Sequence, residues 1–579
     1  MKLLLTAINA KYIHSCLAVY DLAAYCKDLP AHCVVKEYTI NQQEEHILQS
    51  IYEEHADIIA FSCYLWNIST VTSLARELKK VAPHVKIWLG GPEVSYDAPS
   101  FLLEHPYIDM ILCGEGEETF RELICCTLSG SSYEQVCGIT YRTSDDENIS
   151  AIRSTPPRPY IDMDRIPFIY EDFSAFVNKI IYYETSRGCP FSCSYCLSSV
   201  DKRVRFRSLS LVLPELQKFL DARVPQVKFV DRTFNCRHEH AYAIWSYIKE
   251  HDNGVTNFHF EISADLLKEE DFLLFETMRP GLIQLEIGVQ STNPETITAI
   301  LRSMQLAPLK KAVARIHSFG NIHQHLDLIA GLPNETYDQF RESFNEVYAM
   351  QPDQLQLGFL KVLKGSYMAQ HAKEYDLVTL DRAPYEVLST RWLSYDDVLR
   401  LKEVEEMVEV YYNSGQFSRT LSYVLPFFED AFSFYETLAS YYKGNKLFDQ
   451  KHTRLMRYEI LRDMLTEFQH DTDACLDEYL IADLYATERI KKRPLWAASE
   501  AVTKDAAKQL KDRKWRQLHL TPKEQEAVEH ALSHRTELHL EQYANTLHGD
   551  ILLYNYSSRH PLTNEAERIR LSGTLFNNN

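Results

Sequence analysis

The sequence lacks any run of eighteen apolar residues, the length that a membrane-spanning helix requires. It also lacks the pattern of a signal peptide, because Met1 to Thr6 predicts a buried strand. Nor do its thirteen cysteines, an odd number scattered over 579 residues, form the compact framework of a disulfide-bonded secreted domain. Free thiols fit a reducing compartment, so we expect a cytoplasmic protein without a membrane span.

An excess of positive charge is absent as well. The chain has 61 Lys and Arg against 81 Asp and Glu, for a net charge of −20. Nucleic-acid binding depends on clustered basic side chains, so we do not expect a nucleic-acid partner. The basic clusters of note, 491–493 and 508–516, are interpreted as solvated helix faces. A composition that is 45% hydrophobic and 25% charged suits a globular protein of about three domains.

Strand-like and helix-like segments alternate over the first 130 residues. We expect strands at 3–8, 33–38, 58–62, 85–90 and 108–113, with helices such as 16–28 and 69–81 between them. This alternation predicts a parallel, doubly wound sheet.

Small and polar residues follow four of these strands. Ligands of doubly wound sheets bind at the carboxyl ends of the strands, which lie at one edge. A glycine pair lets a ligand approach the backbone closely, although Gly90-Gly91 alone fits a plain turn equally well. We therefore expect one ligand site made by four loops: Asn9 to His14, Ser62 to Asn67, Gly90 to Glu93, and Gly114 to Glu117.

Three cysteines with C-x-x-x-C-x-x-C spacing, Cys189, Cys193 and Cys196, follow an apolar run at 180–183. Three thiolates on a short loop can hold three irons of a 4Fe-4S cluster and leave the fourth iron open to a small molecule. A structural zinc site would need a fourth ligand and usually a C-x-x-C pair. Three unrelated thiols are the other alternative. The aromatic Tyr195 before the third cysteine favours the cluster.

This motif, C-x-x-x-C-x-aromatic-C after a strand, resembles the signature of the radical S-adenosylmethionine superfamily. The resemblance implies that Cys189, Cys193 and Cys196 bind the cluster and that Tyr195 lies beside the adenine of S-adenosylmethionine. In that superfamily the open iron chelates the amino and carboxylate groups of S-adenosylmethionine. Electron transfer then cleaves the sulfonium to a 5′-deoxyadenosyl radical.

A second β-α series follows, with strands expected at 180–184, 227–231, 258–262, 283–289, 323–329 and 355–360. Six parallel strands match the open partial (β/α)6 barrel that the resemblance implies. Barrel sites lie at the carboxyl ends of strands, and the resemblance places Asp231 near the amino group of S-adenosylmethionine. For each carboxylate, a salt bridge to Arg232, Arg302 or Lys361 is the alternative. The implied S-adenosylmethionine contacts are Tyr195, Asp231, Glu261, Ser263, Glu286, Gln290 and Lys361, with the segment from Lys361 to Gly365 near adenine.

The first domain resembles the cobalamin-binding domain that precedes many radical S-adenosylmethionine domains. The D-x-H-x-x-G motif that supplies a cobalt-binding histidine is absent, and His14 is interpreted as a packing or hydrogen-bonding residue. The cobalamin is therefore expected to lack a histidine below the cobalt. The implied cobalamin contacts are Asn9, Ser62, Tyr64, Gly90, Gly91, Gly114, Glu115 and Gly116.

The chain is predicted to have four parts. These are a cobalamin-binding Rossmann-like domain (1–135), a linker (136–172), a partial barrel (173–366) and a mainly helical carboxyl-terminal domain (367–579). The linker holds a hairpin, 138–142 and 149–153 across the turn 144–148, and the proline-rich stretch 156–159. The order of parts resembles a subfamily whose last domain has no established function.

In the last part we expect helices at 391–412, 419–442, 451–469 and 473–490, a strand pair at 537–541 and 550–556, and a frayed end at 577–579. The dense aromatics between Phe427 and Tyr442 are interpreted as helix core rather than a substrate cage. No chemical motif appears in this part, and no catalytic residue is assigned.

The leading hypothesis is a cobalamin-dependent radical enzyme that transfers a methyl group to an unactivated carbon. Its expected partners are a small-molecule or peptide substrate and an electron donor such as flavodoxin or ferredoxin. Radical rearrangement without methyl transfer uses the same cofactors. A methylthiotransferase-like tRNA-modifying enzyme would need a second cluster, for which Cys16, Cys33, Cys63 and Cys113 are candidate thiols. A non-catalytic sensor is the third alternative.

Overall fold

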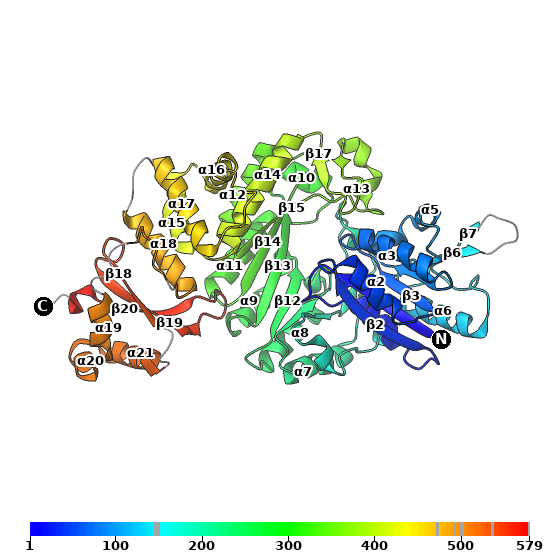
Figure 1. Ribbon diagram of the computed structural model, residues 1–579, viewed down its shortest axis with the longest axis horizontal. Coiled ribbons are helices and arrows are strands. Elements are labelled where there is room, and N and C mark those ends of the chain that lie inside the picture. The colour runs from blue at the N-terminus through cyan, green and yellow to red at the C-terminus, as the bar shows by residue number, and fades with distance from the viewer. Residues whose placement is uncertain (144–150, 470–473, 491, 498–502, 534–537, 577–579) are drawn as a thin grey trace. The chain divides into compact units, whose positions relative to one another are not determined.

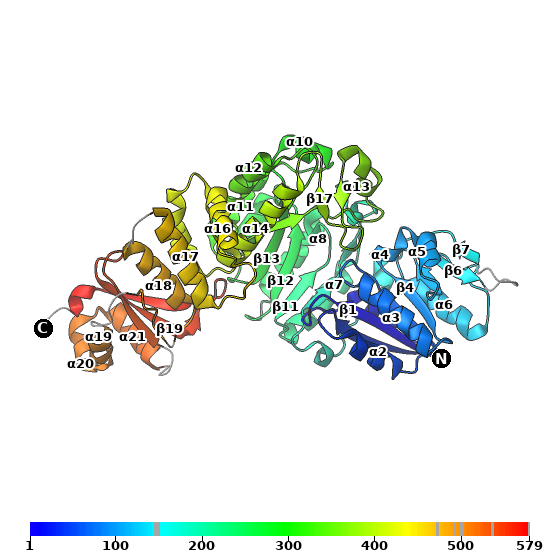
Figure 2. The same ribbon diagram turned by 45° about the horizontal axis from the view of Figure 1, so that its top comes forward.

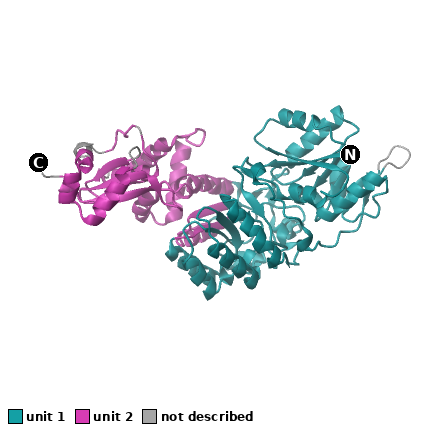
Figure 3. Cartoon of the chain, turned by 90° about the horizontal axis from the view of Figure 1, so that it is seen from below, with its two compact units in different colours: residues 1–320, 329–337, 358–395 teal, residues 321–328, 338–357, 396–579 magenta. Residues whose placement is uncertain are grey.

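The computed structural model describes residues 1–143, 151–469, 474–490, 492–497, 503–533 and 538–576. By internal packing the chain divides into two compact units (Figure 3). Unit 1 consists of residues 1–320, 329–337 and 358–395, and unit 2 of residues 321–328, 338–357 and 396–579. None of the helices among the described residues is long and apolar enough to cross a membrane.

The first sheet has seven strands in the order β2-β1-β3-β4-β5-β6-β7 (Figure 1). Five are parallel and match the predicted strands: β1 (Lys2–Asn9), β2 (His32–Thr39), β3 (Ile58–Ser62), β4 (Lys86–Gly90) and β5 (Met110–Leu112). The predicted hairpin forms β6 (Ile139–Thr143) and β7 (Ala151–Ser154), but β6 pairs antiparallel with β5. The sheet therefore extends past residue 135, and the turn at 144–148 lies outside the described residues.

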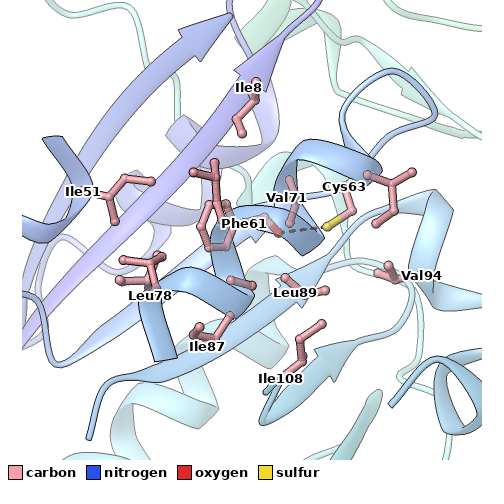
Figure 4. Packing of buried hydrophobic residues seen from close by; sticks show 14 of the residues in the cluster. Ile8, Ile51, Phe61, Cys63, Val71, Leu78, Ile87, Leu89, Val94 and Ile108 are labelled. Carbon is pink, nitrogen blue, oxygen red and sulfur yellow. Dashed lines mark hydrogen bonds between the residues drawn. The ribbon is translucent and has the colours of Figure 1, made fainter. Parts of the chain in front are cut away.

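Helices cover both faces of this sheet, as a doubly wound fold requires (Figures 1 and 2). On one face α2 (Glu44–Tyr52), α3 (Ile68–Val81) and α5 (Ala98–Glu104) share a buried core with the strands, to which Ile51, Val71 and Phe101 belong. Figure 4 shows Ile51 and Val71 in this core. On the other face α1 (Leu17–Tyr25) and α6 (Glu117–Ser129) pack through Val19, Phe120 and Leu123. The strands are buried on both sides, which explains their continuous apolar sequences.

The second sheet has six strands in the order β15-β14-β13-β12-β11-β8, so the expected partial barrel is confirmed. The strands are β8 (Ile181–Tyr183), β11 (Gln226–Phe229), β12 (Asn257–Ile262), β13 (Ile283–Gln290), β14 (His323–Ala330) and β15 (Gln354–Phe359). The intervening helices include α7 (Leu209–Asp221), α8 (His238–Glu250), α9 (Glu269–Glu276), α10 (Pro294–Ala299), α11 (Leu306–Phe319) and α12 (Tyr337–Tyr348).

The carboxyl-terminal part is mainly helical, as predicted, but one predicted helix is two. Instead of a helix over 419–442 the chain forms α15 (Ser418–Val424) and α16 (Ala431–Gly444). Pro426 lies in a tight turn between them, and Asp430 caps α16. The other helices are α14 (Tyr395–Val408), α17 (Arg454–Gln469) and α18 (Ala474–Thr487). Phe432, Phe434 and Tyr435 are fully buried, which confirms a helix core, although Phe427 is 45% exposed.

A three-stranded antiparallel sheet ends unit 2. The predicted pair forms β18 (Leu538–Tyr543) and β19 (Asp550–Arg559), and β20 (Ala566–Leu571) was not foreseen. Helices α19 (Thr503–Lys511), α20 (Arg513–His519) and α21 (Pro522–Ser533) share a core with its strands. Two residues of the basic clusters contradict a solvated face, because Arg516 is buried and Arg493 pairs with Glu541 of β18. Residue 491 and the end at 577–579 lie outside the described residues.

Candidate active site at the cysteine loop and the edge of the first sheet

The cysteine loop follows β8 and is held by backbone hydrogen bonds on both sides. The amide of Cys189 donates to the carbonyl of Asp201 (3.0 Å), and that of Ser194 donates to the carbonyl of Ile300 (2.9 Å). Gly188 has φ +93°, and a Cβ there would lie 2.3 Å from the carbonyl oxygen of Arg203. Only glycine fits this turn, so the glycine before the first cysteine sets the path of the loop. Cys189 and Cys193 are buried and Cys196 is half-buried.

Asp231, at the end of β11, holds the segment that leads into this loop. Its buried carboxylate accepts hydrogen bonds from the amide of Thr185 (3.0 Å), the hydroxyl of Thr185 (2.7 Å) and the hydroxyl of Ser186 (2.6 Å). Burial raises the pKa of Asp231 to about 6, against the pull of these donors. The contact of Asp231 with the amino group of S-adenosylmethionine stays a prediction, whereas its support of the loop is visible in the structure.

Arg302 joins the cysteine loop to β13. Its guanidinium donates to the hydroxyl of Tyr195 (3.2 Å), the sulfur of Cys193 (3.6 Å) and the carbonyl oxygen of Gly288. A cation beside a thiolate lowers the cost of its negative charge. From the sequence, Arg302 was expected only as a salt-bridge partner of a carboxylate, and its contact with the cysteine loop was missed.

Buried polar atoms without a hydrogen-bond partner gather around this loop. They are the hydroxyl of Ser194, the side-chain amide oxygen Oε1 of Gln290 and the Nε of Arg302. Gln290 also has φ +73°, which is rare for a residue with a side chain. Orphaned buried polar atoms are uncommon in native proteins unless a ligand satisfies them. The residues present therefore fit a polar ligand held between the cysteines and the end of β13.

The other predicted S-adenosylmethionine contacts lie on strands β12 and β13 or after β15. Glu286 is paired with Lys228 (3.1 Å) and His259 (2.9 Å), two residues outside the set that was expected. Glu261 is its register neighbour on β12. The hydroxyl of Ser263 donates to Asp265 (2.6 Å), and the exposed Lys361 pairs through its backbone with Glu386. The ligand contacts of these residues stay predictions.

A cavity of about 880 Å³ opens at the carboxyl edge of the first sheet, within unit 1. On one side it is lined by all eight predicted cobalamin residues: Asn9, Ser62, Tyr64, Gly90, Gly91, Gly114, Glu115 and Gly116. On the other it is lined by residues that flank the cysteines, including Arg187, Gly188, Leu197 and Ser198. The cavity thus reaches from the sheet edge to the cysteine loop, and its aromatic side chains, Tyr64 and Trp66 among them, fit the flat ring of a corrinoid.

The charges around this cavity are mostly paired. Arg205 binds Glu115 through two hydrogen bonds (2.6 and 3.1 Å), and the amide of Ile161 donates to the same carboxylate (2.8 Å). Arg187 binds Glu117 (2.6 Å) and Glu184 (2.9 Å). Glu115 therefore joins the first domain to the linker as well as lining the cavity.

Asp21 of α1 faces the same cavity from within the first domain. Burial, followed by the negative charge of Glu117, raises the pKa of Asp21 well above its usual range. His14 lies nearby and its Nδ1 is 2.6 Å from the hydroxyl of Tyr182 on β8. This contact agrees with its interpretation as a hydrogen-bonding residue.

The candidate thiols for a second cluster are built into the first domain's cores. Cys63 belongs to the core under α2, α3 and α5, with Cys113 packed against it. Cys16 and Cys33 lie in the core under α1 and α6. Among the residues that the structure describes, no three His, Cys, Asp or Glu side chains surround a single metal-ion position. In a 4Fe-4S cluster each thiolate binds a different iron, so the three cysteines of the loop do not need to surround a single metal position.

Three family models match the chain. The B12 binding domain matches residues 4–124, the radical SAM superfamily residues 183–347, and a protein of unknown function, DUF4080, residues 373–568. The chain belongs to the radical S-adenosylmethionine enzymes that carry a B12-binding domain. Its cofactors are cobalamin, a 4Fe-4S cluster and S-adenosylmethionine, and the residues described above fit all three.

Curated relatives are distant. An uncharacterized methyltransferase of Pyrococcus horikoshii is 26% identical over 369 residues, which cover 62% of this chain and 76% of that protein. The cobalamin-dependent radical SAM methyltransferase TokK of Streptomyces tokunonensis is 27% identical over 309 residues, or 50% of this chain. The match spans 44% of TokK, less than half of its length.

Solved structures share the fold. The cobalamin-dependent radical enzyme OxsB with aqua-cobalamin bound has a TM-score of 0.59 at 15% identity, over 83% of this chain and 80% of that one. TsrM from Kitasatospora setae, a radical S-adenosylmethionine methyltransferase with cobalamin and a [4Fe-4S] cluster bound, has a TM-score of 0.55 at 15% identity, over 66% and 76%.

Several residues that line the cavity or hold the cysteine loop were not predicted from the sequence. Arg187 could have been noticed, because a charged side chain stands two residues before the first cysteine. Tyr96, Tyr160 and Tyr182 gave no signal, since single tyrosines outside a motif are usually packing residues.

Proposed function

We propose that this enzyme transfers a methyl group from S-adenosylmethionine, by way of cobalamin, to an unactivated carbon of its substrate. The observation that carries the proposal is the single cavity that joins the eight predicted cobalamin residues to the flanks of the cysteine loop. A cavity shared by both sites allows a methyl carrier and a radical source to act on one substrate atom. Several relatives, TokK among them, are named as methyltransferases.

When bound, the cluster and S-adenosylmethionine supply a 5′-deoxyadenosyl radical for hydrogen abstraction, and cobalamin supplies the methyl group. The protein's contribution is to position these groups. Asp231 fixes the entry to the cysteine loop, and Arg302 ties Cys193 and Tyr195 to β13. Apolar side chains such as Leu5, Leu89 and Phe120 line the cavity and keep water from a reactive radical.

The partners belong to the same proposal. The substrate is a small molecule or a peptide, and the electron donor is a flavodoxin or ferredoxin. The four-part division of the chain at residues 135, 172 and 366 is proposed as the functional division, with the hairpin β6-β7 of the linker joined to the first sheet. The mainly helical last part (367–579) follows the barrel in the sequence. The cores that hold Cys16, Cys33, Cys63 and Cys113 favour this proposal over a methylthiotransferase with a second cluster.

The test measures where an isotope label on the methyl group of S-adenosylmethionine is transferred. Anaerobically reconstituted protein receives cobalamin, a strong reductant and S-adenosylmethionine with a deuterated methyl group. We expect 5′-deoxyadenosine and label on the corrinoid, and label in a product once substrate is supplied. Cys193→Ala should form no 5′-deoxyadenosine, whereas Cys236→Ala, the matched control outside the motif, should form it. Cleavage of S-adenosylmethionine without any label on the corrinoid or a product would contradict methyl transfer.

A further inference from the structure

Residues 361–387, which follow β15 within unit 1, touch both cofactor sites. We call this segment the strap. On the side of the cysteine loop, the amide of Met368 donates to the carbonyl oxygen of Ser194 (2.8 Å), between the second and third cysteines. Met368, Leu360 and Val387 also form a buried cluster against which Tyr195 packs. The strap therefore supports the loop that carries the cluster and the predicted adenine contact.

The strap is also fastened to the first domain, at the helices after Gly91. The hydroxyl of Tyr385 donates to the buried carboxylate of Glu93 in α4 (Pro92–Ser95). The ammonium of Lys364 pairs with Asp97 (3.1 Å) and lies 5.6 Å from the ring centre of Tyr385. These are two polar ties between the strap and one short segment, 93–97.

A third tie is steric. Gly365 has φ +84°, and a Cβ there would lie 2.3 Å from the ring of Tyr96. The backbone of the strap at Gly365 thus contacts this ring directly. Tyr96 also lines the cavity, together with Gly90, Gly91 and Pro92. A ligand that fills the cavity meets the same ring that covers Gly365.

We propose that the strap couples the two cofactor sites, so that cobalamin in the cavity raises the affinity of the enzyme for S-adenosylmethionine. Cobalamin fixes Tyr96 and α4, which are held to the strap by Glu93 and Asp97. The strap then presents Lys361 to Gly365 and supports Tyr195, so the second ligand meets segments that are already ordered. Because binding linkage is reciprocal, S-adenosylmethionine raises cobalamin affinity by the same factor. The inference rests on the cofactors of the proposed function and not on methyl transfer.

The test is a pair of binding measurements on the full chain with its cluster. The dissociation constant of S-adenosylmethionine is measured anaerobically by equilibrium dialysis, with and without bound cobalamin. We expect a ratio of about tenfold, inside the usual range of coupling between two sites. In Tyr385→Phe the ratio should fall, and in Tyr385→Phe with Lys364→Met, which loses both polar ties to the segment 93–97, it should fall to about one while iron content stays unchanged.

The matched control is Tyr107→Phe, which also loses a hydrogen-bonded hydroxyl in the first domain, 2.8 Å from the Nδ1 of His105, but does not line the cavity. It should keep the wild-type ratio. A second variant, Gly365→Ala, should also lose the ratio, because a Cβ at this position clashes with the ring of Tyr96. A wild-type ratio of one, or a wild-type ratio retained in the Tyr385 and Lys364 double variant, overturns the proposal.

A measurement without cobalamin separates this inference from the proposed function. S-adenosylmethionine alone should slow amide hydrogen exchange in α4 and α5 (residues 92–104) of the wild type, and should not do so in Tyr385→Phe with Lys364→Met. If the protein binds no cobalamin, the proposed function fails and this exchange measurement alone decides the coupling. Unchanged exchange in the wild type rejects it.

Discussion

Gly90 and Gly91 stand side by side at the end of β4 but are required for different reasons. Gly91 has φ +111°, and a Cβ there would lie 2.5 Å from the carbonyl oxygen of Cys63. A Cβ on Gly90 would make an ordinary 3.7 Å contact with Leu112. The fold therefore requires glycine at position 91 but tolerates a side chain at position 90. A substitution of Gly90 can test ligand binding without disturbing the fold.

We expect Gly91→Ala to destabilise the first domain by about 2 kcal/mol, from backbone strain and a clash with a neighbouring strand. Gly90→Ala should keep the fold, but its added methyl group projects from the cavity wall toward the ligand. We expect cobalamin to bind at least about tenfold more weakly, which corresponds to a loss of roughly 1.4 kcal/mol of binding free energy. Thermal unfolding and the visible absorbance of bound corrinoid measure the two effects. Full cobalamin affinity in Gly90→Ala would remove that glycine from the proposed contacts.

His240 supports the cysteine loop from α8, and its support depends on pH. Its Nε2 lies 3.2 Å from the hydroxyl of Thr185, and burial lowers its pKa from 6.5 to about 4. Between these values the unfolded chain binds a proton that the native site does not. The stability contributed by neutral His240 is therefore present above pH 6.5 and is lost as the pH falls toward 4.

At pH 5 this loss amounts to about 2 kcal/mol relative to pH 8. Asp231, which also contacts Thr185, has a raised pKa and acts in the opposite direction between pH 6 and 4. We therefore compare the wild type with His240→Gln, in which only the histidine contribution is removed. Hydrogen exchange of the amides at 181–186 should show a difference that shrinks by about 2 kcal/mol from pH 8 to pH 5. A difference that is constant with pH would mean that His240 has the same pKa in the native and unfolded states.

The break between α15 and α16 rests on a capping box at Asp430. Its carboxylate accepts from the amide of Ser433 (2.8 Å) and pairs with Arg341 of α12 (2.7 Å). Asp430→Ala should destabilise unit 2 by about 2 kcal/mol, since it removes a helix cap and an ion pair. The neighbouring Glu429, 78% exposed, also contacts Arg341. Glu429→Ala should change stability by less than about 0.5 kcal/mol, and equal effects in thermal unfolding would argue against the cap.

The elements that the sequence predicted best are those with a strong local pattern. Strands of the first sheet such as β1 and β3 are continuous apolar runs, and strands of the second sheet such as β13 alternate apolar with polar residues. All eleven strands predicted for the two sheets are present. The hairpin was predicted, but its pairing with β5 is a tertiary choice that local sequence does not encode. The strand β20 was missed because polar residues such as Glu567 and Arg568 interrupt its apolar positions. The split at Pro426 was missed although proline is a known break.

The sequence could predict which residues lie together in the site where the strand topology brings them to one edge of a sheet. Loops at the carboxyl ends of parallel strands must share an edge, so Asn9, Ser62, Gly90 and Gly114 could be expected together from the strand order alone. What sequence could not show is how side chains divide their contacts. Asp231 supports Thr185, and Glu115 binds Arg205, because long-range partners are chosen by packing and not by motif.

The number of irons per chain distinguishes the proposed enzyme from one with two clusters. The cysteine loop provides three thiolates for a single cluster, whereas Cys16 and Cys63 are built into cores that pack on opposite faces of the first sheet. A thiol held in a core cannot reach a cluster without unpacking its neighbours. Anaerobically reconstituted protein should therefore contain about four irons per chain and one corrinoid.

The same preparation of a triple variant, with Cys189, Cys193 and Cys196 replaced by Ala, should contain almost no iron. It should still bind cobalamin, because none of the three thiols lines the cavity. Iron is measured by colorimetric assay and corrinoid by visible absorbance after gel filtration. About eight irons in the wild type, or about four remaining in the triple variant, would require a second cluster and would favour the methylthiotransferase alternative.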